Sequence, residues 1–358
     1  MRQKLPDELV HADDTLHDFF CRVSFSRYLN PLNVSEARSD FMAGAESPPF
    51  AYMPASWAAD AQEMLKGLKP PESHPFGPML QKSIDGTRIF VEALSDRSSS
   101  AFKDLMDFSG WRPDESLMKT VGTQERQTDG RPFTKGADEL VAELKEALLQ
   151  RGLSDWQVEL DSVMSARVLV DSAKRILRVN SRARFRDRDT RKLIAHEIDV
   201  HAVRAVNGQR QPLWVFSTGL PGSLETEEGL ALYAEECVNA SSPGNGWRQG
   251  LVVQAVSWAE EMGFRELYER LLEVGGSSLA WGIALRVKRG LKDPSLPGVY
   301  GKDVVYFRGL RTVRNWLESG GDIGQLYVGK VSVEHPVQQW LDAGLIEPGS
   351  LPEMFLDA

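Results

Sequence analysis

Two histidines placed five positions apart make a specific demand on the backbone that carries them. The run HEIDVH (residues 196–201) lies within residues 190–207, whose pattern predicts a helix. On a regular α-helix, five residues rotate a side chain roughly 140° away from its partner, so His196 and His201 would not face one metal ion. A π-type turn, which bonds residue i to residue i+5, brings the two side chains back into line. We therefore predict a π-bulge or an equivalent widening between His196 and His201.

The same run resembles the HExxH helix of zinc peptidases, with one more residue between the histidines. In such helices both histidines bind zinc, and the glutamate after the first histidine is the general base. This pattern predicts Glu197 as a catalytic residue and one Zn²⁺ ion held by His196 and His201. The alternative is a pair of partly buried histidines that are satisfied by hydrogen bonds, and the run by itself supports both interpretations.

A second acidic motif follows one helix later and supplies a third ligand. Catalytic zinc sites commonly use two histidines and one glutamate, and they keep a fourth position for water. The run TEEGLA (residues 226–231) begins a predicted helix over residues 225–238, and it predicts Glu228 as the third ligand. Glu235 shares a helix face with Glu228 and is expected to support a histidine. Glu227 is interpreted as an acidic residue that is favoured near a helix N-terminus.

The composition is that of a globular protein and excludes some partners. Hydrophobic residues make up 42% of the 358 residues, and the formal net charge is −9. The acidic balance argues against nucleic acid as a partner, and no apolar run is long enough to span a membrane. The N-terminus lacks the apolar core of a signal peptide, and two distant cysteines do not make a disulfide framework. These features predict a cytoplasmic protein without a membrane partner.

The order of predicted elements indicates an α+β fold, with a mainly helical body and a small sheet packed beside a zincin-like metal helix. Residues 1–153 are expected to form a mainly helical N-terminal region, which ends in an amphipathic helix over residues 137–150. Residues 154–358 are expected to form the metallopeptidase catalytic region. Within it, residues 167–171 and 175–180 read as two strands of a hairpin.

At the two motifs the sequence resembles the bacterial QEGLA-motif (flavohaemoglobin expression-modulating) proteins and the microtubule-associated tyrosine carboxypeptidases. The resemblance rests on HEIxxH followed by TEEGLA, and it extends to residues 306–309 (YFRG) and 329–330. It implies a zinc metallocarboxypeptidase with His196, His201 and Glu228 as ligands and Glu197 as the catalytic residue. Glu227 stands where the bacterial motif has Gln. The implied partner is the C-terminus of a peptide or protein.

A carboxypeptidase needs a cation for the terminal carboxylate of its substrate. Arg311, Arg308 and Arg204 are candidates, and we select Arg311 as the substrate-binding residue. The nearby Tyr306 is predicted to be catalytic by hydrogen-bonding the developing oxyanion, although ordinary amphipathic packing also explains it.

Four arginines, at positions 182, 184, 186 and 188, would share one side of an extended strand. They predict either the steering of an acidic substrate tail or a charged edge that blocks sheet pairing.

Two further functional interpretations stay open from the sequence. One is a regulatory or binding protein that retains the zinc site without turnover. The other is a metal-dependent hydrolase of a different amide or ester. Release of C-terminal amino acids from a peptide library, lost in Glu197→Gln, separates a carboxypeptidase from both.

Overall fold

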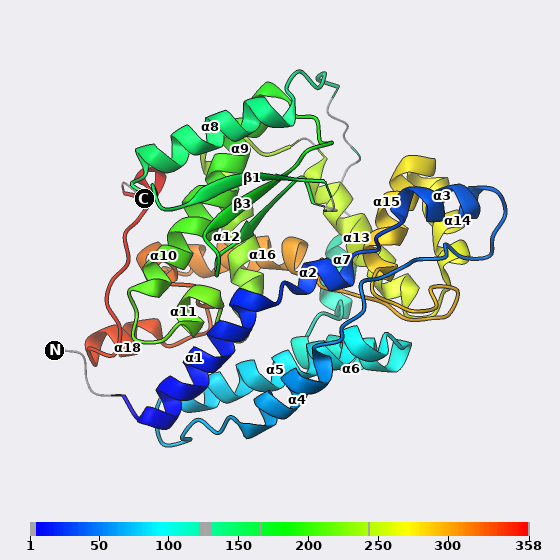
Figure 1. Ribbon diagram of the computed structural model, residues 1–358. Helices are drawn as coiled ribbons and strands as arrows, with labels where there is room; N and C mark the ends of the chain where they lie inside the picture. Colours follow the sequence, from blue (N-terminus) through cyan, green and yellow to red (C-terminus); the bar gives the residue numbers. More distant parts are fainter. Residues whose placement is uncertain are drawn as a thin grey trace.

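The computed structural model describes residues 5–121, 126, 130–162, 164, 166–242 and 244–356. Within these ranges the chain is mainly helical and contains a three-stranded mixed sheet, which confirms the α+β class (Figure 1). Both cysteines, Cys21 and Cys237, are free thiols. Across the described ranges, no helix has the length and apolar character that crossing a bilayer requires.

The sheet has three short strands: β1 (Gln157–Asp161), β2 (Val168–Asp171) and β3 (Ile176–Asn180). Strand β3 is central; it pairs in parallel with β1 and antiparallel with β2, so the predicted hairpin is confirmed. Its alternating residues Leu177 and Val179 are fully buried. They join a core cluster with Leu144 of α8 (Ala137–Gln150) and with Ile198, which connects the sheet to the helix that carries the histidines.

The histidine-bearing segment is a continuous helix of three parts: α9 (Asp187–Leu193), a π-helix (Ile194–Ala202) and α10 (Val203–Gln209). It begins three residues before the predicted start, and the Asp189 carboxylate accepts a hydrogen bond from the Arg186 backbone at the first turn. The predicted π-type widening is confirmed. Ile198 faces the sheet core, whereas Val200 faces a second core cluster. Because both faces are packed, polar side chains of this helix need partners.

Helix α12 (Ser223–Cys237) lies between the π-helix and α16 (Val304–Glu318) and contacts both. Figure 1 shows α12 and α16 side by side in the middle of the molecule. Five polar residues in α12 are buried: Ser223, Thr226, Glu227, Glu228 and Glu235. Charged residues are almost never buried without partners. The three glutamates therefore mark the place where α12 meets the histidines.

The N-terminal region is helical, as predicted, and consists of α1 (Asp7–Arg22), α2 (Phe25–Leu29), α3 (Val34–Met42), α4 (Ala58–Gly67), α5 (Gly77–Asp96), α6 (Ser99–Ser109), α7 (Glu115–Val121) and α8. Its side chains do not form a separate core. Leu9 and Leu16 of α1 belong to the same buried cluster as Val200 and Leu230. The two predicted regions therefore fold against each other.

The remaining elements are α11 (Val215–Thr218), α13 (Asn245–Ala259), α14 (Phe264–Gly275), α15 (Ser277–Lys288), α17 (Ile323–Leu326), α18 (Val337–Asp342) and a 3₁₀ turn (Glu353–Phe355). Helices α14 and α15 pack together with α3 at one end of the molecule (Figure 1). Their core includes Phe41, Phe264 and Trp281. Residues 289–303 connect α15 to α16, and this passage forms part of one wall of the cleft described below.

Candidate metal centre

The π-helix turns His196 and His201 toward one point. Their ring centroids lie 4.9 Å apart with the planes at 80°. One potential ligand atom from each of His196, Glu197 and His201 lies within 4.8 Å of the others. On a regular α-helix, histidines five residues apart would point in different directions. The π-helix, which bonds residue i to residue i+5, compensates for the added residue and places both imidazoles on one face.

Glu228 completes a set of three ligand atoms. Its Oε2 atom lies 3.7 Å from Nε2 of His196 and 3.7 Å from Nε2 of His201. Zinc bonds of about 2.0–2.1 Å in tetrahedral geometry separate neighbouring ligand atoms by about 3.3 Å. The same Oε2 atom is buried and has no hydrogen-bond partner among the described residues. An unpaired buried carboxylate oxygen equidistant from two imidazole nitrogens fits a bound cation.

Two further glutamates of α12 orient the histidines. His196 donates a hydrogen bond from Nδ1 to Glu235 at 2.8 Å, and His201 donates one from Nδ1 to Glu227 at 2.7 Å. Each Nε2 then faces Glu228 and would bind a metal ion once it is deprotonated. Burial opposes protonation of His196, but the carboxylates of Glu228 and Glu235 raise its pKa to about 10, so metal binding there would release a proton. The predicted supporting role of Glu235 is confirmed by this contact. The interpretation of Glu227 as a helix-terminus residue is wrong, because it is buried and bonded to a histidine.

A buried cationic cluster keeps Glu227 ionised. Burial alone would raise its pKa, but the Lys330 ammonium, 3.0 Å away, and the Arg204 guanidinium hold the pKa well below its usual range. Arg204 is fully buried and also donates to the backbone carbonyls of Leu326, Gly329 and Val331. Arg204, considered above for the substrate carboxylate, therefore has a structural position beneath the site.

Glu228 has a cationic neighbour of its own. Lys302 places Nζ 3.7 Å from Oε1 of Glu228. Burial opposes ionisation of Glu228, but the neighbouring His196 and Lys302 lower its pKa to about 2. The carboxylate is thus an anion at neutral pH, as a metal ligand must be.

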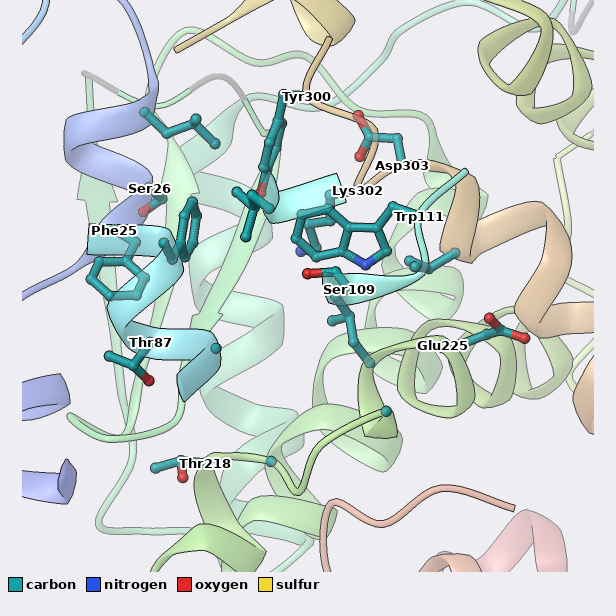
Figure 2. A pocket seen from close by; sticks show the side chains of 18 of the residues that line it. Phe25, Ser26, Thr87, Ser109, Trp111, Thr218, Glu225, Tyr300, Lys302 and Asp303 are labelled. Carbon is teal, nitrogen blue, oxygen red and sulfur yellow. The ribbon is translucent and has the colours of Figure 1, made fainter. Parts of the chain in front are cut away.

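A cleft of about 670 Å³ opens beside these residues. Figure 2 shows its wall built from segments far apart in the sequence, among them Phe25, Trp111, Thr218 and Lys302. The N-terminal part of the chain supplies aromatic and aliphatic side chains together with polar and charged ones, including Arg27 and Lys82. The last turns of α15 and the passage to α16 supply further charged side chains, including Arg286, Lys302 and Asp303. Lys302 therefore links the cleft to Glu228.

Tyr306, predicted to be catalytic, also lines this cleft from the first turn of α16. Burial raises its pKa well above the usual value, and the carboxylates of Glu228 and Glu197 contribute. Its hydroxyl is therefore protonated at neutral pH and available as a hydrogen-bond donor close to the metal centre. Tyr306 also packs against the core cluster that contains Val305 and Phe307, so amphipathic packing and a place on the cleft wall both apply to it.

The arginines predicted for substrate binding are placed differently. Arg311 is not among the described residues that line the cleft, and its Nη1 donates to Thr120 of α7 at 2.9 Å. Arg308 lines the cleft, but its guanidinium binds Glu225 and two backbone carbonyls. The cations that face the cleft near Glu228 are Lys302 and Arg286, which no sequence motif singled out.

The expected strand of alternating arginines is wrong. Residues 181–186 form a turn and an irregular segment with a single bridge between Lys135 and Phe185, and Arg188 lies in α9. Asp187 and Asp189 lie in the first turn of α9, where acidic residues favour the start of a helix. Arg167 donates a hydrogen bond to Asp189. The helix therefore begins where the extended strand was expected to continue.

Comparison with known proteins agrees with the geometry. The family profile described as "Microtubule-associated tyrosine carboxypeptidase" matches residues 115–358. The chain belongs to this family. Microtubule-associated tyrosine carboxypeptidase 1 of Homo sapiens is 30% identical over 255 residues, which are 68% of this chain and 53% of the relative. The Mus musculus protein of the same name is 28% identical over 255 residues, with the same coverage. The chain spans about half the length of these relatives.

The family match includes every residue of the candidate metal centre described above, together with Lys302 and Tyr306. Helices α1 to α6, which supply part of the cleft wall, precede the matched residues. The candidate metal ligands thus lie within the matched residues, whereas part of the cleft wall comes from the helices that precede them. The resemblance to the bacterial QEGLA-motif proteins stays a prediction.

Proposed function

We propose that this protein is a zinc-dependent carboxypeptidase that removes the last residue from a peptide or protein. The observation that carries the proposal is the convergence of Nε2 of His196, Nε2 of His201 and Oε2 of Glu228. Two neutral imidazoles and one carboxylate are a common ligand set of catalytic zinc. When bound there, zinc would polarise a carbonyl as a Lewis acid and lower the pKa of a water molecule to about 7.

Glu197 is the proposed general base. It follows His196 directly, and one of its oxygens lies within 4.8 Å of ligand atoms of both histidines. From there its carboxylate accepts a proton from water while the water oxygen bonds to the scissile carbonyl carbon. The same carboxyl then returns that proton to the amine as the C–N bond breaks. The products are a shortened peptide and a free amino acid, so no other reactant is needed.

Tyr306 is the proposed donor to the oxyanion. Its phenol stays protonated, since burial and the nearby Glu228 both disfavour the phenolate. A neutral phenol donates one hydrogen bond, and a preorganised donor of this kind stabilises the charge that develops on the carbonyl oxygen. Its place on the cleft wall allows this contact without a change in the fold.

The cleft supports a peptide terminus as the substrate. The names of the relatives specify tyrosine as the residue removed, and the apolar side chains of Phe25, Phe90 and Trp111 line a space suited to a large ring. Lysine and arginine side chains on the opposite wall favour an anionic segment. An acidic chain that ends in a tyrosine or another aromatic residue is therefore the proposed substrate class.

The test combines metal analysis with a peptide-library digest. One equivalent of zinc is expected in the purified protein and is lost in His196→Ala. Mass spectrometry of the digest is expected to show release of single C-terminal residues. Glu197→Gln should abolish release while retaining zinc, and Glu236→Gln, at an exposed pair with Arg314, is the matched control. Zinc without any cleavage would favour the binding-protein alternative, and cleavage of other amides or esters alone would favour a different hydrolase.

A further inference from the structure

Arg286 is a rigidly held cation in the cleft wall. It extends from the last turns of α15, and Asp303 binds its Nε at 2.5 Å and its Nη2 at 3.0 Å. Asp303 is buried, and although burial opposes ionisation, Arg286 and Arg289 lower the pKa of its carboxyl to about 2. A two-point contact between planar groups fixes the orientation of the guanidinium. Arg286 is therefore positioned before any ligand arrives.

This cation lies one side chain away from the metal centre. The guanidinium carbon of Arg286 is 5.8 Å from the ring centroid of Tyr306. Tyr306 in turn is close enough to Glu228 and Glu197 for their charges to raise its pKa. Arg286, Lys302 and Tyr306 line the same cleft. A group bound at Arg286 is thus near the position of a scissile carbonyl without touching the metal ligands.

The outer edge of Arg286 is available for an anion. Asp303 takes up Nε and Nη2, and Nη1 has no hydrogen-bond partner among the described residues. The side chain is 39% exposed and lines the cleft. Two other arginines of the cleft are engaged: Arg308 binds Glu225 and backbone carbonyls, and Arg178 faces Asp161 and Asp171.

We propose that Arg286, held by Asp303, receives the C-terminal carboxylate of the substrate and thereby makes the enzyme act on chain ends. The inference rests on the proposed function. A guanidinium fork matches the planar carboxylate, and it offers no equivalent contact to a C-terminal carboxamide. Because the carboxylate is held beside Tyr306, the last peptide bond is the one presented to Glu197. Arg286 is thus a specificity-determining residue, and it takes the role first predicted for Arg311.

The test compares two peptides that differ only at the terminus. Both end in tyrosine; one has a free carboxylate and the other a carboxamide. Binding of N-terminally labelled peptides is measured by fluorescence anisotropy on the zinc-loaded, full-length Glu197→Gln chain. The carboxylate form is expected to bind roughly 10–100-fold more tightly. Adding Arg286→Gln should reduce this ratio to near one by weakening the carboxylate form alone.

Three further variants make the result specific. Arg286→Lys keeps the charge but loses the fork, so an intermediate ratio is expected; it also serves if Arg286→Gln fails to fold. Arg314→Gln, an exposed arginine on α16, should leave the ratio unchanged. The inference is overturned if Arg286→Gln and Arg286→Lys retain the full ratio, or if Arg311→Gln abolishes it instead.

Hydrolysis by the chain with Glu197 intact separates this inference from the proposed function. If neither peptide is cleaved but an Arg286-dependent preference for the carboxylate persists in binding, the proposed function fails and the inference stands. If tyrosine is released and the preference survives both changes at Arg286, the inference fails and the proposed function stands.

Discussion

Gly229 of α12 lies directly against Gly309 of α16, and this contact sets the distance between the two helices. A Cβ atom on Gly229 would lie 2.2 Å from the carbonyl carbon of Gly309, and one on Gly309 would lie 2.1 Å from the Glu225 oxygen. Only glycine permits such an approach. Because α12 carries Glu228 and α16 carries Tyr306, the contact also determines how the cleft meets the metal centre.

Gly229→Ala is expected to destabilise the protein by about 1–3 kcal/mol, since the added methyl group forces two backbones apart. The free energy of unfolding is measured by urea titration. Gly282→Ala is the matched control, because no atom lies within 4 Å of a Cβ at that helical position. There the gain in helix propensity should stabilise the protein by up to about 1 kcal/mol. Equal effects of the two changes would contradict the tight contact.

Removal of the metal should lower the melting temperature. A ligand that binds the folded state alone stabilises it, and the stabilisation is lost when the ligand is chelated. A chelator is therefore expected to lower Tm, and added zinc to restore it. His201→Gln should melt at the same temperature with and without chelator. A chelator effect that persists in His201→Gln would place the metal elsewhere.

Glu227→Gln is expected to cost about 3–5 kcal/mol, because it leaves the buried charges of Arg204 and Lys330 without their counter-charge. Zinc affinity should also fall by about 10–100-fold, since His201 loses the carboxylate that orients it. Urea unfolding and competition with a chromogenic chelator measure the two effects. The exposed Glu236→Gln serves as control, and unchanged zinc affinity in Glu227→Gln would rule out the orienting role.

Tyr306→Phe should lower kcat by about 100-fold while KM changes little, because the lost hydrogen bond acts on the transition state. Steady-state hydrolysis of a peptide ending in tyrosine gives both constants. Zinc content is expected to be unchanged, which separates this effect from loss of the metal. A variant that raises KM and leaves kcat intact would assign Tyr306 to substrate binding.

Asp13 gives a pH dependence that is independent of the metal centre. Burial raises its pKa from 3.8 to about 7, although the backbone N–H groups of Trp214 and Val215 oppose the shift. Between these two values the folded state binds more protons than the unfolded state, so stability falls as the pH rises. This contribution is complete below about pH 3.8 and is lost as the pH passes about 7. The slope of unfolding free energy between pH 5 and pH 8 should be smaller in Asp13→Asn, and equal slopes would refute the assignment.

Local sequence patterns were sufficient for much of the fold and for a proposed ligand set. The spacing of His196 and His201 predicted the π-turn, because helix geometry leaves few ways to align residues five apart. Helix α8 and the β2–β3 hairpin followed from apolar periodicity and turn residues. Glu228 followed from the ligand types that zinc requires. Each of these inferences depends on residues close together in the sequence or on the ligand types that zinc prefers.

The sequence by itself determined which residues can bind a metal and which helices carry them. Only the tertiary structure decided which charges surround the candidate metal site. Glu227 became a histidine partner, and Arg286 rather than Arg311 came to face the cleft, through contacts between helices that no local pattern encodes. The physical reason is that the pairing of a buried charge depends on the distance between side chains, and helix packing sets that distance across long separations in sequence.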